Sequence, residues 1–212
     1  PDAVNLTSAG SILDDATDAT VINASVATLN AANAIGASGA NNQLDTTLAT
    51  LNAAAASGGV FVGETDAITL NTVTAGGATN DVVITNAAAD ITLVSVSAPD
   101  LVDITSAVGS IVDDNANATV IAGTTAVLTA GAGIGVAGAN GQIDTTVGTL
   151  TASAANGSVF IGETDAITLL DVNAAGGGND VTVTNAAGNM TVVSVTAPDQ
   201  ANLTATVGSI LD

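Results

Sequence analysis

Apolar and polar residues alternate in short runs along the whole chain. The alternation is clearest at residues 82–85, 91–96 and 192–195. A period of two residues with many β-branched side chains predicts strands. Clusters of Gly, Asn, Asp and Ala, as at 74–80 and 174–180, predict the turns between them. No segment combines helical periodicity with helix caps, so we expect an all-β chain.

The chain contains a long internal repeat. Residues 11–109 recur as 110–208 without insertion or deletion, and 56 of the 99 aligned pairs are identical. Residues 1–10 resemble the end of a repeat, and 209–212 match the start of a third copy. A fixed period is typical of stacked or beaded architectures. We therefore expect a segment of a longer array, with repeat 1 at 11–109 and repeat 2 at 110–208.

A shorter period divides each repeat. Similar patterns recur about every 20 residues, which suggests five sub-units per repeat. This is the coil length of a parallel β-helix, or β-solenoid, in which stacked coils share one core. Five coils would make the repeat a whole number of turns and let repeat 2 stack directly on repeat 1. The sequence thus predicts one continuous solenoid.

Tandem immunoglobulin-like β-sandwiches are the alternative, because about 100 residues is also the length of such a domain. A sandwich of this kind usually buries Trp or Tyr, and the chain has neither. It also gives no role to the 20-residue period. The two Phe residues, Phe61 and Phe160, occupy equivalent repeat positions and are predicted to fill the core.

The composition of the chain argues against several classes of binding partner. The chain has no Lys, Arg, His or Cys, and its 20 Asp and Glu residues give a net charge of −20. Without cations it cannot neutralise phosphates, which argues against nucleic acid and anionic membrane surfaces as partners. It has no run of 18 apolar residues, so we expect no membrane insertion.

The repeats also resemble a known family. Residues 140–169, 178–199 and 201–212 are similar to the repeat regions of filamentous-haemagglutinin-like proteins, which are large bacterial exoproteins and adhesins. The resemblance covers essentially the whole chain as a pattern of Thr, Val, Gly and Asn. It implies a right-handed parallel β-helix shaft, secreted and held at the cell surface or in the matrix. The expected function is structural, and the expected partners are further copies of the repeat in a longer chain or filament.

Acidic residues provide candidate Ca²⁺ ligands, because Ca²⁺ takes six to eight oxygen ligands. The candidates recur in both repeats: Asp14, Asp15, Glu64 and Asp66 in repeat 1, and Asp113, Asp114, Glu163 and Asp165 in repeat 2. Neither of the common calcium-loop motifs is present. Solvated carboxylates that keep the chain soluble are therefore the favoured interpretation, and no cofactor is otherwise expected. A Ca²⁺-stabilised array of β-sandwich adhesin repeats is the alternative.

Catalysis is not expected. Paired carboxylates can hydrolyse glycosides, but the chain has no His, Lys, Arg, Tyr or Cys to serve as base, nucleophile or clamp. Polysaccharide binding and ice binding remain more remote alternatives. Ice binding needs Thr-x-Thr in register on successive coils, and Thr145, Thr146, Thr149 and Thr151 are too scattered for that.

Overall fold

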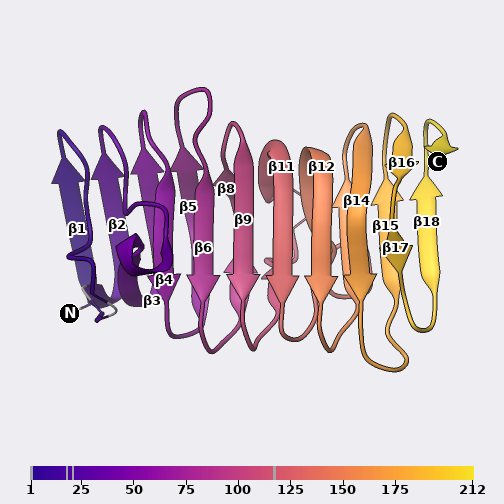
Figure 1. The fold of residues 1–212 in the computed structure, drawn as a ribbon, viewed down its shortest axis with the longest axis horizontal. Helices are drawn as coiled ribbons and strands as arrows, with labels where there is room; N and C mark the ends of the chain where they lie inside the picture. Colours follow the sequence, from indigo (N-terminus) through magenta and orange to yellow (C-terminus); the bar gives the residue numbers. More distant parts are fainter. Residues whose placement is uncertain (1, 18, 21, 117) are drawn as a thin grey trace.

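The chain is a β-solenoid (Figure 1). The computed structural model describes residues 2–17, 19–20, 22–116 and 118–212. Across these residues every strand pairing is parallel, and each strand pairs with a segment one turn away. About nine turns stack, about 22 residues apart. This confirms the predicted solenoid and overturns the β-sandwich alternative, whose sheets are antiparallel.

The described part of the chain contains only one helical segment, the 3₁₀ turn η1 (Ala40–Asn42). No helix among these residues has the length and apolar character needed to span a bilayer.

The strands form two faces that enclose the core. Face 1 contains β1 (Ala3–Ser8), β5 (Ile68–Ala75), β7 (Ile91–Leu93), β8 (Val96–Ser97), β10 (Ile111–Asp113), β13 (Val159–Glu163), β15 (Val181–Asn185) and β18 (Ala201–Ala205). Face 2 contains β4 (Val60–Glu64), β6 (Val82–Asn86), β9 (Leu101–Ser106), β14 (Ile167–Ala174), β16 (Met190–Val192), β17 (Val195–Thr196) and β19 (Ile210–Leu211). Four longer strands pass from one face to the other, namely β2 (Ile22–Ala31), β3 (Leu44–Ala55), β11 (Ile121–Ala130) and β12 (Ile143–Ala154).

The two repeats place equivalent strands on opposite faces. In repeat 1, β4, β6 and β9 stack on face 2, whereas their equivalents β13, β15 and β18 stack on face 1. Along face 2, β9 is followed by the second half of β11. The arrows of β6 and β9 accordingly point opposite to those of β15 and β18 (Figure 1).

This arrangement fixes the number of turns in a repeat. Ile12 stacks with Ile35 and Val60 on face 2, whereas its equivalent Ile111 pairs with Ile91 on face 1. A repeat of 99 residues at about 22 residues per turn is four and a half turns. The expectation of five coils, and of a whole number of turns, is therefore wrong. The parallel pairing nevertheless continues from one repeat into the next, because either face can take either set of strands.

Alternation along each strand builds the core. One inward column runs through Ala27, Leu51, Leu70 and Leu93, each fully buried, in four successive coils. Stacking similar side chains at the strand spacing of about 4.8 Å packs the interior without large aromatic residues.

The two aromatic residues do not fill the core, contrary to the prediction. Phe61 and Phe160 take the outward positions of β4 and β13, between buried Val and Ile neighbours, and are half-buried. The ring of Phe61 lies against Gly59, where an added Cβ would come within 2.5 Å of it. The two Phe side chains point outward because successive side chains of a strand point to opposite faces, and the residues on either side of each Phe point inward.

Candidate functional site

A buried glutamate marks the end of β4. Glu64 is 2% exposed and accepts a hydrogen bond from the Thr46 hydroxyl at 2.8 Å. The backbone N–H groups of Leu48, Thr65 and Asp66 also donate to its carboxylate, at 3.1, 2.9 and 3.0 Å. Glu64 thus caps the backbone where the chain leaves the strand.

The polar column continues through the next two coils. Glu64 pairs in register with Asn86, and Asn86 with Ser106. Asn86 donates to the Asp66 carbonyl at 2.6 Å and accepts from the Ala88 N–H at 3.0 Å. Ser106 donates to the Ala89 carbonyl at 2.8 Å. Each side chain therefore satisfies backbone groups of its own corner or of the adjacent coil, as buried polar groups require.

Repeat 2 builds the same corner around Glu163, on the opposite face. Thr145 donates to its carboxylate at 2.7 Å, and the N–H groups of Val147, Thr164 and Asp165 donate at 3.2, 2.8 and 3.1 Å. Burial raises the pKa of Glu163 to about 7, and the four hydrogen bonds offset only part of that rise. The chain has no cationic side chain that could oppose it further.

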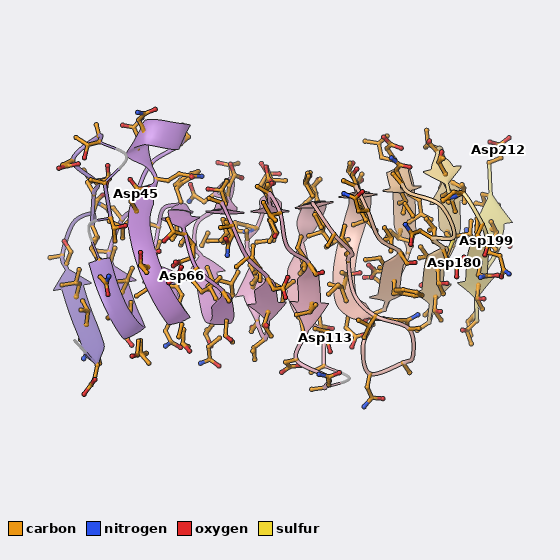
Figure 2. The ribbon with its side chains drawn as sticks, turned by 90° about the horizontal axis from the view of Figure 1, so that it is seen from below. Asp45, Asp66, Asp113, Asp180, Asp199 and Asp212 are labelled. Atoms are coloured by element: carbon orange, nitrogen blue, oxygen red, sulfur yellow. The ribbon has the colours of Figure 1, made fainter. Side chains whose placement is uncertain are left out.

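The acidic pairs form local turns. Asp113 is the buried last residue of β10 and Asp114 follows it where the chain leaves the strand (Figure 2). Asp113 accepts from the Asn115 N–H at 2.7 Å, and Asp114 from the Ala116 N–H at 3.0 Å. Such bonds to the backbone two residues on are typical of Asx turns. Burial raises the pKa of Asp113 to about 6, and the charges of Asp114 and Asp144 add to the rise. Asp14 and Asp15 make the equivalent turns in repeat 1.

These placements bear on the calcium hypothesis. Glu64 and Glu163 direct their carboxylates at backbone donors, and Asp66 and Asp165 lend backbone N–H groups to them. Among the residues that the structure describes, no three acidic side chains gather closely enough to hold a metal ion. Calcium binding by the eight acidic candidates, the alternative interpretation, stays a hypothesis. The favoured interpretation of solvated carboxylates is wrong for Glu64, Asp113 and Glu163, which are buried.

Outward threonines are more regular than the sequence suggested. Thr125, Thr149, Thr168 and Thr191 pair in register on four successive coils of face 2. The expectation of scattered threonines is wrong for this column. The adjacent column, however, holds Val127, Thr151 and Asp171, so a Thr-x-Thr surface does not extend along the rod.

Sequence reasoning missed one feature that the two repeats share. A surface groove runs past Gln43, Asp45, Gly63 and Thr85 in repeat 1, with a volume of about 320 Å³. An equivalent groove of about 340 Å³ in repeat 2 passes Gln142, Asp144, Gly162 and Thr184. We call these axial groove 1 and axial groove 2. The motif Gln-x-Asp-Thr-Thr, which is the same in both repeats, could have pointed to this groove. It matches no known catalytic or binding motif, so the sequence analysis did not single it out.

Comparison with known proteins gives no further guide to the role of these features. No family model matches the chain, and no curated protein or solved structure matches it significantly.

Proposed function

We propose that the chain is a structural segment of a bacterial extracellular or cell-surface fibre, a shaft that sets distance and resists proteolysis. The observation that carries the proposal is the parallel pairing, which continues through both repeats on both faces. A solenoid stacked in this way has its strands across the long axis and hydrogen bonds along it. Each repeat of four and a half turns adds about 22 Å of length at about 4.8 Å per turn.

Composition supports an exposed setting. The chain has no Lys or Arg and therefore no site for trypsin-like proteases. The resemblance to filamentous-haemagglutinin-like repeats supports secretion and display by a bacterium. The net charge of −20 would keep neighbouring rods apart and soluble.

The shaft function can be tested by using the chain as a spacer. With donor and acceptor fluorophores at the two ends, single-molecule energy transfer should give one narrow distance. Deleting residues 110–208 should shorten that distance by about 22 Å and leave the distribution narrow. A broad distribution in the intact chain would contradict a stiff shaft. Antibodies against the chain should also label intact cells of the source organism, and labelling only after permeabilisation would contradict surface display.

Acid should promote lateral association of the rods. Protonation of carboxylates as the pH falls weakens the repulsion between chains that carry 20 acidic residues and no basic ones. Light scattering should therefore rise as the pH falls from 6 towards 4, and the rise should reverse on return to neutral pH. Scattering that stays flat over this range would show that charge does not keep the rods apart.

A further inference from the structure

The C-terminal coil is exposed where the equivalent residues in the middle of the rod are buried. Ile210 is 48% exposed, whereas its equivalent Ile111 is fully buried. Leu203 is only partly buried, whereas its equivalent Ile104 is fully buried. The difference arises because the next coil of the rod, residues 121–135, covers both Ile104 and Ile111.

A second comparison shows which positions such a coil covers. Val207 and its equivalent Val108 are both 64% exposed, although Val108 lies next to coil 121–135 in the rod. A neighbouring coil therefore buries the inward side chains and leaves this corner exposed. The edge of residues 195–212, which includes β17, β18 and β19, is the surface that such a coil would cover, and we call it the terminal surface.

Inside the chain, the equivalent of the terminal surface takes a coil in a defined register. β9 pairs with the second half of β11, Leu101–Ser106 with Thr125–Ala130, and β8 pairs with the first half. The Gly135 N–H also donates to the Ile111 carbonyl at 2.8 Å. A coil of this kind is the expected cover for the terminal surface, because the coils of a solenoid stabilise their direct neighbours.

Repeat 1 has the same coil near the opposite end of the rod, at residues 22–36 (Figure 1). Its neighbour on the outer side is the N-terminal segment, residues 2–14. β1 pairs with Val26–Ala31, and the Gly36 N–H donates to the Ile12 carbonyl at 2.8 Å. These contacts match those between β9 and the second half of β11.

The two terminal segments therefore fit one binding place. Residues 199–212 are the repeat 2 equivalents of 100–113, which lie against such a coil in the middle of the rod. Residues 2–14 fill the same place on coil 22–36. β1 and β18 lie at opposite ends of the rod, so residues 199–212 can reach coil 22–36 only on a second copy of the chain (Figure 1).

The N-terminal segment covers only half of coil 22–36. Among the described residues, the first half of β2, Ile22–Ala24, pairs with β3 alone. The equivalent residues of β11 pair with β8 as well, at Ile121 with Val96. β17 is the repeat 2 equivalent of β8 and would supply the missing neighbour. Replacing the N-terminal segment by the terminal surface of a second copy thus adds a strand pairing that neither copy has alone.

We propose that the chain assembles head to tail with further copies of itself by exchange of segments. The terminal surface of one copy binds coil 22–36 of the next and displaces residues 2–14 of that copy. Such a heterologous contact does not close on itself and builds a filament. Each added copy contributes about nine turns, or about 43 Å at about 4.8 Å per turn. The proposal rests on the shaft function and names the joint by which shafts extend.

A disulfide between copies tests the register of this joint. The chain has no Cys, so Asn23→Cys and Thr196→Cys, made in separate chains, each introduce one outward thiol. Their equivalents Ala122 and Ser97 pair in register inside the rod. Mixing the two variants under mild oxidation should give a disulfide-linked dimer, whereas either variant alone should remain a single chain. Coils that stacked without exchange would hold the two positions about 9.6 Å apart, beyond the reach of a disulfide.

Charge substitutions locate the joint. Ile210→Asp should weaken assembly at least tenfold, because the joint would bury its charge against Ile35. Val207→Asp makes the same charge change at a corner that stays exposed beside a neighbouring coil, and it should assemble like the unchanged protein. Sedimentation velocity over a wide range of concentration measures the assembly, at physiological ionic strength to screen the repulsion between rods. Thermal melts check that each variant is folded.

Leu6→Asp separates exchange from simple end-to-end contact. Leu6 belongs to β1, which leaves coil 22–36 when copies join by exchange. Weakening β1 should therefore leave assembly unchanged or strengthen it. In simple end-to-end contact β1 would itself form the joint, and the variant would lose assembly.

Four results would overturn the proposal. They are a chain that sediments as a monomer at every concentration, mixed Cys variants that give no linked dimer, an Ile210→Asp variant that assembles as well as Val207→Asp, and loss of assembly in Leu6→Asp. None of them contradicts the shaft function, which the single-molecule distance tests at dilutions where copies do not meet. A broad distance distribution there would contradict the stiff shaft whether or not copies join.

Discussion

Raising the pH from 5 to 8 is expected to lower the free energy of unfolding by about 2.5 kcal/mol through Glu163 alone. Burial raises the pKa of this carboxyl to about 7 in the folded chain, from 4.5 in its ordinary state. A raised carboxyl pKa means that the folded state holds its proton more tightly than the unfolded state. The stabilisation is complete below about pH 4.5 and is lost as the pH rises through 7. Urea unfolding at pH 5, 6, 7 and 8 measures this loss of free energy of unfolding.

Glu163→Gln provides the comparison. The amide stays neutral at every pH, so the contribution of this position should no longer vary between pH 5 and 8. Asp165→Asn, at an exposed neighbour, should leave the pH dependence as in the unchanged protein. Burial also raises the pKa values of Asp103, Asp113 and Asp144, so a weaker trend of the same sign should survive in Glu163→Gln. An unaltered slope in that variant would refute the assignment to Glu163.

Gly135→Ala is expected to cost about 3 kcal/mol, from the strain of a left-handed backbone and from overpacking. Gly135 has φ +65°, and an added Cβ would lie 2.5 Å from the Phe160 carbonyl oxygen of the next coil. That oxygen belongs to the wall of the solenoid, because Phe160 N–H donates to the Ile134 carbonyl at 2.8 Å. The coils would have to separate locally to make room. Urea unfolding at pH 5, where Glu163 is protonated, isolates this effect.

Gly177→Ala is the matched control. An added Cβ at Gly177 meets no atom within 4 Å. Its effect on the free energy of unfolding should stay within about 0.5 kcal/mol, as for other open surface positions. Equal losses in the two variants would show that the close approach at Gly135 does not limit the stacking of the coils.

Much of the fold could be predicted from local pattern. Alternation at residues 82–85 and 91–96 predicted strands that the structure confirms as β6, β7 and β8. The short internal period predicted stacked coils, because one coil cannot bury its apolar residues alone. An all-β chain was expected, and even the Ala-rich segment 53–56 lies mostly in a strand, β3.

The candidate site was harder to predict. Glu64 and Glu163 were identified as candidate residues, but they were expected to be exposed to solvent because they belong to an acidic motif. The alternation of side chains along β4 and β13 instead directs them into the core. Gln43, Asp45 and Thr85 were missed, although the first two belong to the motif Gln-x-Asp-Thr-Thr, which recurs in both repeats. They meet only because coils 18 and 22 residues apart stack in register, at Asp45 with Gly63 and at Gly63 with Thr85.

The sequence by itself determined that this chain forms strands, that they stack as coils, and that every charged side chain is acidic. Alternation, turn residues and composition are local properties, and they suffice for those conclusions. Only the tertiary structure decided that a repeat is four and a half turns and that its equivalent features face opposite ways. Both faces bury the same alternating pattern of apolar side chains, so a strand fits either one. Which face it joins depends on the summed lengths of all the corners before it, and no local pattern records that sum.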